Sequence, residues 1–79
     1  MENIETYNKV FKECFSLNDE ELNNSLVYQS ISGWDSVGHM HLIAVMEDTF
    51  GIMMDTEDII DFSSYEKGKG ILKKYGVNM

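Results

Sequence analysis

The sequence predicts an all-α fold: a small four-helix bundle with a long first loop and a short third helix, folded as a single domain over residues 1–79. Three observations support this prediction. Apolar residues recur at steps of three and four in several segments, which is the spacing of one helical face. Residues that favour helix starts and helix ends flank these segments. No run alternates between apolar and polar residues, the pattern typical of a half-buried strand.

The first helix is expected to begin near Ile4. Its apolar stripe continues through Tyr7, Val10, Phe11 and Cys14. Because Cys14 lies on this stripe, we expect a buried and unreactive thiol. The segment 16–33 is rich in Asn, Ser, Asp and Glu and is predicted to be the long loop. A loop of this length in a compact domain is usually functional or packed by its own side chains.

The second helix is predicted from Ser36 to Phe50, with Gly51 as the signal that ends it. One stripe of this helix faces the core, and it consists of His39, Leu42, Ile43, Met46 and Phe50. Another face mixes apolar, polar and acidic residues, and it consists of Val37, Met40, His41, Ala44, Glu47 and Asp48. A helix that only packs on a core rarely exposes such apolar residues, so this face indicates contact with a partner.

A short third helix is predicted from Asp55 or Thr56 to Phe62, since Asp55, Glu57 and Asp58 place negative charge in its first turn. Negative charge at the N-terminus of a helix stabilises it, because the backbone N–H groups there carry partial positive charge.

The fourth helix is predicted to begin at Ser63 or Ser64 and to end at Gly76. Ser63 and Glu66 have the spacing of a capping box. Gly68 lies inside this helix, where a glycine costs about 1 kcal/mol relative to alanine. Close packing against another helix would explain it.

Composition restricts the partners. The net charge is −8 and the isoelectric point is near 4.4. Such a surface repels nucleic acid and anionic lipid, so we expect neither, and a basic protein is the natural partner. The single cysteine and the absence of a long apolar run or a basic-apolar leader predict a cytoplasmic protein with no membrane association. We expect a monomer.

Charge is unevenly distributed along the chain. Residues 35–61 contain seven acids and no Lys or Arg. The acids are Asp35, Glu47, Asp48, Asp55, Glu57, Asp58 and Asp61. After Tyr65 the chain carries four lysines against one glutamate. The predicted second and third helices therefore form an acidic surface, and the last helix is basic.

The residues do not indicate catalysis by the chain itself. Asp35, Ser36 and His39 include the residue types of a nucleophile and a base, but neighbouring side chains at a helix start point apart. The glycine-flanked serine motif of hydrolases is absent. His39 and His41 are two residues apart and do not face each other on a helix, so we expect no metal site.

Ser36 is the most informative candidate site. Its hydroxyl lies at the N-terminus of the second helix, where backbone N–H groups and the helix dipole favour an anion. A phosphate on this hydroxyl would be well placed. If the residue is unmodified, it is an N-cap only.

The segments around Ser36 resemble an acyl carrier protein, a member of the phosphopantetheine-binding carrier family, of the stand-alone type. The resemblance rests on residues 34–43 (WDSVGHMHLI), on residues 47–52 (EDTFGI) and on residues 58–62 (DIIDF), and it extends through the fourth helix. It implies an acyl-carrier-like bundle. The first helix matches least specifically.

The resemblance implies a non-catalytic role. A separate phosphopantetheinyl transferase would move 4′-phosphopantetheine from coenzyme A onto Ser36, and Asp35 would help to engage the transferase. The thiol of the arm would carry an acyl or aminoacyl group as a thioester. Partner enzymes that activate or transfer this group would bind the carrier through basic docking patches.

Further residues are assigned by position in the resemblance. The partner-recognition residues are Val37, Met40, His41, Ala44, Glu47, Asp48, Asp55, Glu57 and Asp58. An acyl pocket between the second and third helices would be lined by Ile43, Met46, Met54, Ile59 and Ile60. The alternative for each residue of this second set is a plain core position.

The sequence departs from fatty-acid carriers, which usually have acidic or polar residues where Gly38 and His41 stand. Trp34 and the preceding residues 26–31 are more similar to stand-alone carriers of dedicated pathways, which handle amino acids, polyketides or surface-glycan units. A general carrier of fatty-acid synthesis is the alternative within the family. The alternative from another class is an acidic helical interaction module in which Ser36 is only an N-cap.

Overall fold

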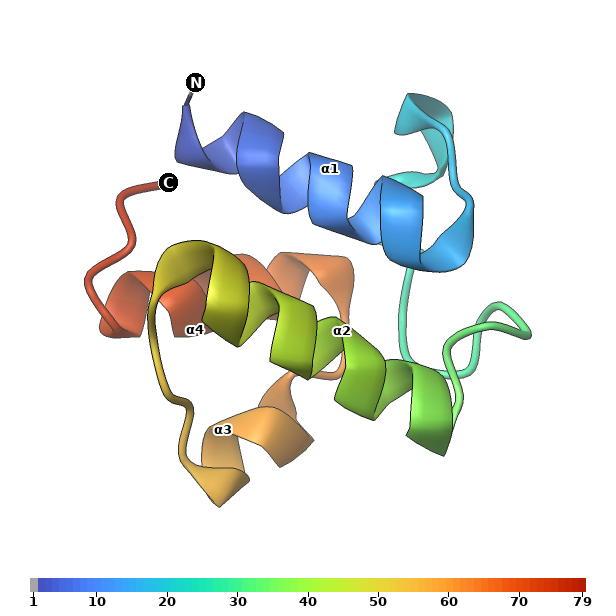
Figure 1. Ribbon diagram of the computed structural model, residues 1–79. Coiled ribbons are helices and arrows are strands. Elements are labelled where there is room, and N and C mark those ends of the chain that lie inside the picture. The colour runs from blue at the N-terminus through green and yellow to red at the C-terminus, as the bar shows by residue number, and fades with distance from the viewer. Residues whose placement is uncertain (1) are drawn as a thin grey trace.

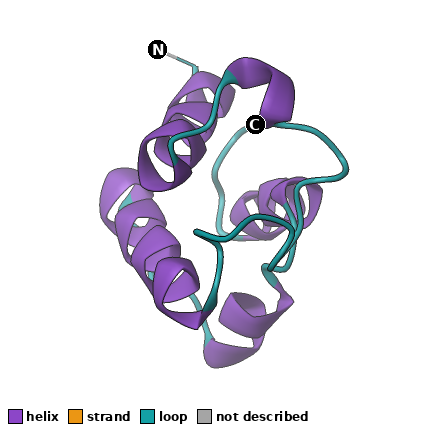
Figure 2. Ribbon diagram, turned by 90° about the vertical axis from the view of Figure 1, so that its right-hand side faces the viewer, coloured by secondary structure: helices purple, strands orange, loops and turns teal. Residues whose placement is uncertain are grey.

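The computed structural model describes residues 2–79 and consists of helices and loops (Figures 1 and 2). Four α-helices are present among these residues, together with one short 3-10 helix. They are α1 (Asn3–Phe15), η1 (Asp19–Glu21), α2 (Ser36–Phe50), α3 (Thr56–Asp61) and α4 (Tyr65–Lys74). The prediction of a small all-α fold with a short third helix is confirmed.

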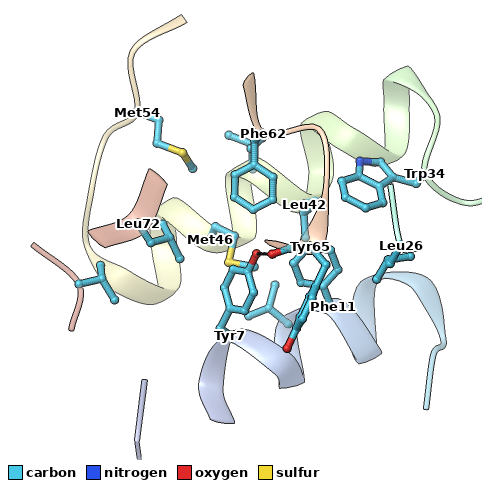
Figure 3. Close-up of a cluster of buried hydrophobic side chains, with 13 residues drawn as sticks. Tyr7, Phe11, Leu26, Trp34, Leu42, Met46, Met54, Phe62, Tyr65 and Leu72 are labelled. Carbon is cyan, nitrogen blue, oxygen red and sulfur yellow. Dashed lines mark hydrogen bonds between the residues drawn. The ribbon is translucent and has the colours of Figure 1, made fainter. Parts of the chain in front are cut away.

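The helices pack so that α1 lies along one side of α2 and α4, while α3 lies on the opposite side of the molecule (Figure 1). Aromatic side chains fill the space between them. Figure 3 shows Tyr7 and Phe11 of α1 directed towards Tyr65 and Phe62. The Phe11 ring lies 5.4 Å from the Tyr65 ring and 5.5 Å from the Trp34 ring, centroid to centroid. These edge-on contacts favour one arrangement of the core.

The ends of α2 agree with the prediction to the residue. Gly51 ends the helix at a φ of 66°, a left-handed conformation that favours glycine.

At the start of α4, Ser64 is the N-cap, and its hydroxyl accepts a hydrogen bond from the Lys67 N–H. The capping box predicted for Ser63 and Glu66 is therefore wrong, because the helix starts one residue later.

The long loop contains structure that its composition did not indicate. Asn18 and Glu21 cap η1 reciprocally, each side chain bonding the backbone N–H of the other. Lys12 of α1 forms a salt bridge with Asp19 at 2.8 Å.

Cys14 of α1 is half-buried, whereas full burial was expected. Burial raises the pKa of its thiol, which keeps the thiol protonated.

Gly68 lies at a close approach of α4 to α1. A Cβ atom added there would collide with the Tyr7 hydroxyl and with the Phe62 ring. The Tyr7 hydroxyl is buried, and it donates a hydrogen bond to the Tyr65 carbonyl at 2.7 Å. The glycine therefore allows α1 and α4 to share a buried hydrogen bond, which confirms the prediction of close packing at this position.

The segment before α2 is anchored to the link between α3 and α4. Val27 and Ser64 form an isolated antiparallel bridge. On one side of it, the Tyr65 N–H donates to the Leu26 carbonyl at 2.9 Å, and on the other the Tyr28 N–H donates to the Ser63 carbonyl at 2.8 Å. The loop is thereby fixed at the side of the bundle where α2 begins.

Candidate functional site

The candidate site is the first turn of α2. Asp35 is the N-cap, and its carboxylate oxygen Oδ1 accepts a hydrogen bond from the Gly38 N–H at 2.8 Å. Ser36 is the first helical residue and is exposed. The expectation that an unmodified Ser36 is itself the N-cap is therefore wrong, because Asp35 takes that role.

Gly38 allows the preceding loop to cross this turn at close range. A Cβ atom on residue 38 would collide with the backbone carbonyl oxygen of Gly33. Glycine is otherwise a weak helix former in such a position. Its structural role is to let residues 33–35 fold tightly over the helix start, which fixes where Ser36 is presented.

Trp34 and His39 connect the start of α2 to the rest of the bundle. The Trp34 side chain is fully buried, and its indole N–H donates to His39 Nδ1 at 2.9 Å. Because Nδ1 accepts, His39 Nε2 carries the ring hydrogen and donates it to the Ile59 carbonyl at 2.8 Å. Both ring nitrogens are thus occupied. The imidazole is a structural link between α2 and α3 and is not aimed at Ser36.

The Ser36 hydroxyl is 3.1 Å from the Tyr28 hydroxyl, and either oxygen can donate in this contact. Tyr28 comes from the anchored loop, eight residues earlier in the chain. Its ring meets His39 edge-on at 5.6 Å and Trp34 edge-on at 6.5 Å, centroid to centroid. The sequence did not predict that Tyr28 contacts Ser36. The one available signal was a tyrosine in a polar loop, because the hydroxyl of a packed tyrosine usually has a hydrogen-bond partner.

The predicted partner-recognition face of α2 is largely exposed. Val37 is 80% exposed and Met40 is 56% exposed. His41, Ala44 and Asp48 are also exposed. These five residues follow helical spacing along one side of α2, starting next to Ser36. The exposed acids Asp55 and Glu57 lie at the start of α3.

Two of the predicted partner-recognition acids have structural contacts. Glu47 is half-buried, and its carboxylate accepts the Met54 N–H at 2.9 Å, which holds the segment after α2. Asp58 is only 6% exposed. Its carboxylate accepts hydrogen bonds from the Lys74 ammonium, 3.0 Å from each oxygen, and from the Tyr75 hydroxyl. The expectation that Asp58 belongs to the exposed acidic surface is therefore wrong.

Most residues assigned to an acyl pocket are core residues in this structure. Ile43 and Met46 are fully buried, and Met54 is buried as well. Ile59 packs partly buried against the same core. Ile60 is exposed and lines a hollow with a volume of about 230 Å³, which is otherwise formed by Tyr28, His39, Phe62 and Ser63. Tyr28, which lines this hollow, also contacts Ser36 through its hydroxyl.

Two features are absent from residues 2–79. No group of three or more His, Cys, Asp or Glu side chains in this range is arranged to hold a metal ion. None of the helices in the same range is long and apolar enough to cross a membrane. No protein family model and none of the curated proteins matches this chain.

Proposed function

We propose that this chain is a carrier protein of the acyl carrier type, in which Ser36 bears a covalent 4′-phosphopantetheine arm. The arm's thiol holds an acyl or aminoacyl group as a thioester and presents it to enzymes of a dedicated pathway. The chain performs no chemistry itself. Its modification depends on a separate phosphopantetheinyl transferase that uses coenzyme A.

The observation that carries this proposal is that the Ser36 hydroxyl is exposed at a helix start that another residue already caps. A serine that served only to start the helix would have its hydroxyl on the backbone N–H groups. Here Asp35 does this, so attachment of a group to Ser36 leaves the cap intact.

The surroundings of Ser36 favour a phosphodiester. The N–H groups at the beginning of an α-helix lack partners within the helix, and Asp35 satisfies only that of Gly38. The N–H groups of Ser36 and Val37 remain available to an attached phosphate, and the helix dipole favours its negative charge. The neighbouring Tyr28 hydroxyl is an additional donor.

The lack of a base next to Ser36 is consistent with activation by another enzyme. Both nitrogens of His39 are occupied, and the Asp35 carboxylate bonds the backbone. A serine hydroxyl without a base is a weak nucleophile. The base for the transfer is therefore expected from the transferase.

The exposed face of α2 supports recognition by partner enzymes. It combines apolar side chains near Ser36, at Val37 and Met40, with Asp48 further along the helix. Acidic residues around an apolar centre favour basic partners and speed their association without requiring tight binding. Such a surface suits a carrier that visits several enzymes in turn.

Intact-mass measurement tests the proposal. The folded chain, incubated with coenzyme A and a phosphopantetheinyl transferase of broad specificity, is expected to gain the mass of one phosphopantetheine group. The Ser36→Ala variant is expected to keep its original mass because the acceptor oxygen is gone.

The matched control is Ser32→Ala, which removes another exposed serine hydroxyl from the loop four residues upstream. This variant should be modified like the wild type. The proposal is contradicted if the folded wild-type chain stays unmodified by several transferases that modify a reference carrier under the same conditions.

A further inference from the structure

Tyr28 and Ser36 meet through their hydroxyl groups. The two hydroxyl oxygens lie 3.1 Å apart at the surface of the molecule, where the Ser36 side chain would otherwise be free to rotate. A serine side chain has three staggered positions about its first torsion angle. A hydrogen bond from a fixed partner selects the one that keeps Ser36 Oγ next to the Tyr28 oxygen.

Tyr28 is a fixed partner because its backbone and its ring are both held. Its N–H donates to the Ser63 carbonyl at 2.8 Å, directly beside the bridge between Val27 and Ser64. Its ring is enclosed edge-on by Trp34 and His39. These contacts leave the hydroxyl as the part of Tyr28 that reaches Ser36.

The residues that pack against Tyr28 are held by further contacts. Trp34 is fully buried and stacks on the Phe15 ring at 5.4 Å, and its indole N–H is bonded to His39. His39 in turn bonds the Ile59 carbonyl of α3. The loop, α1, α2 and α3 therefore all contribute to the position of one hydroxyl group.

We propose that Tyr28 is a positioning residue for the modification of Ser36, holding its oxygen in the orientation from which it attacks. This inference rests on the proposed carrier function. In the transfer, a bond forms between Ser36 Oγ and the phosphorus that carries the pantetheine. The bond from this phosphorus to the bridging pyrophosphate oxygen breaks, and adenosine 3′,5′-bisphosphate leaves with its electron pair. The Ser36 proton passes to the transferase.

The Tyr28→Phe variant isolates this role because it keeps the ring and removes only the hydroxyl. Without its partner, Ser36 spreads over the three staggered positions, and the fraction in the productive one falls to about a third. The kcat of modification is therefore expected to fall about threefold. The KM for the carrier is expected to stay unchanged, because the exposed face of α2 that meets the transferase is untouched.

The matched control is Tyr65→Phe, which also removes a single tyrosine hydroxyl. That hydroxyl donates to Asn8 of α1, on the side of the molecule away from α3. This variant is expected to retain the wild-type kcat and KM. Both variants are first compared with the wild type by circular dichroism and thermal unfolding, so that a loss of folding is recognised as such.

A second measurement does not depend on any transferase. The NMR scalar couplings between the Hα and Hβ protons of Ser36 report how its side chain is distributed among the staggered positions. The unmodified wild type is expected to give the couplings of one dominant position, and Tyr28→Phe the averaged couplings of three.

Several outcomes overturn the inference. One is averaged Ser36 couplings in the wild type, and another is an unchanged kcat in Tyr28→Phe. A change in KM that accompanies a lower melting temperature would assign Tyr28 a structural role only. These results leave the carrier function intact as long as the wild type is modified. If the wild type is not modified by any transferase, the carrier function and this inference fail together.

Discussion

At the scale of single residues, Gly38 shows how one missing side chain determines the site. The loop before α2 crosses the first turn of the helix at a distance that excludes a Cβ atom, since that atom would meet the Gly33 carbonyl oxygen. Backbone atoms cannot move aside by changing a rotamer, as the end of a flexible side chain can. The position of Ser36 therefore depends on the absence of a side chain at Gly38.

A Gly38→Ala substitution is expected to destabilise the protein by about 1–3 kcal/mol, the usual cost of overpacking a tight site. The matched control is Gly70→Ala in α4, where an added Cβ meets no atom within 4 Å. That variant is expected to be more stable by up to about 1 kcal/mol, because alanine favours a helix over glycine. Urea unfolding measures both, and a stabilising effect at both positions would contradict the argument.

At the scale of elements, α3 is held by the C-terminal end of α4. Tyr75 follows α4 and accepts the Asp55 N–H at 2.9 Å while donating to the Asp58 carboxylate. Lys74 donates to both oxygens of the same carboxylate. A six-residue helix is too short to be stable by its own hydrogen bonds. These contacts therefore explain why α3 is helical at its place in the bundle.

This arrangement predicts a specific pH dependence of stability. Hydrogen bonds from Tyr75 and Lys74 hold the pKa of Asp58 below its ordinary value. A carboxyl group with a lowered pKa in the folded protein stabilises the fold above its unfolded pKa, which is about 3.9, and this contribution is lost as the pH falls further. Asp58→Asn is therefore expected to be less stable than the wild type at pH 7, and the difference is expected to shrink at pH 3.

Urea midpoints of the wild type and the variant at both pH values measure this difference. Glu57→Gln serves as the control, since it neutralises an exposed acid of the same helix. Its difference from the wild type is expected to be small at both values. If Asp58→Asn and Glu57→Gln follow the same pH curve, the contact with Tyr75 and Lys74 does not stabilise the fold.

At the scale of the whole molecule, the sequence predicted those features of the fold that depend on hydrophobic periodicity and on local start and stop signals. The limits of α2 followed from its apolar spacing and from Gly51, and the exposure of Val37 and Met40 followed from the same spacing. Contacts between distant segments could not be predicted this way. The bond between Tyr28 and Ser36 and the burial of Asp58 depend on which loop or helix end comes to lie beside them.

The charge distribution leads to a last prediction, which concerns association. The exposed acids of α2 and α3 lie on the same part of the chain as Ser36, whereas α4 carries most of the lysines. If basic partners approach along α2, Asp48→Lys should raise the KM for modification by the transferase several-fold at low ionic strength. Salt screens charges at the surface, so the difference from the wild type should shrink as salt is added.

The design of this variant follows from the structure. Glu47 is left unchanged because its carboxylate bonds the Met54 N–H, and its loss would disturb the segment after α2. A lysine at position 48 lies in the last turn of α2, where positive charge favours the helix. Glu20→Lys, an equal change of charge on the exposed η1, is the control and should leave the KM nearly unaltered. Equal effects of the two variants would mean that only the net charge matters and that α2 is not the docking face.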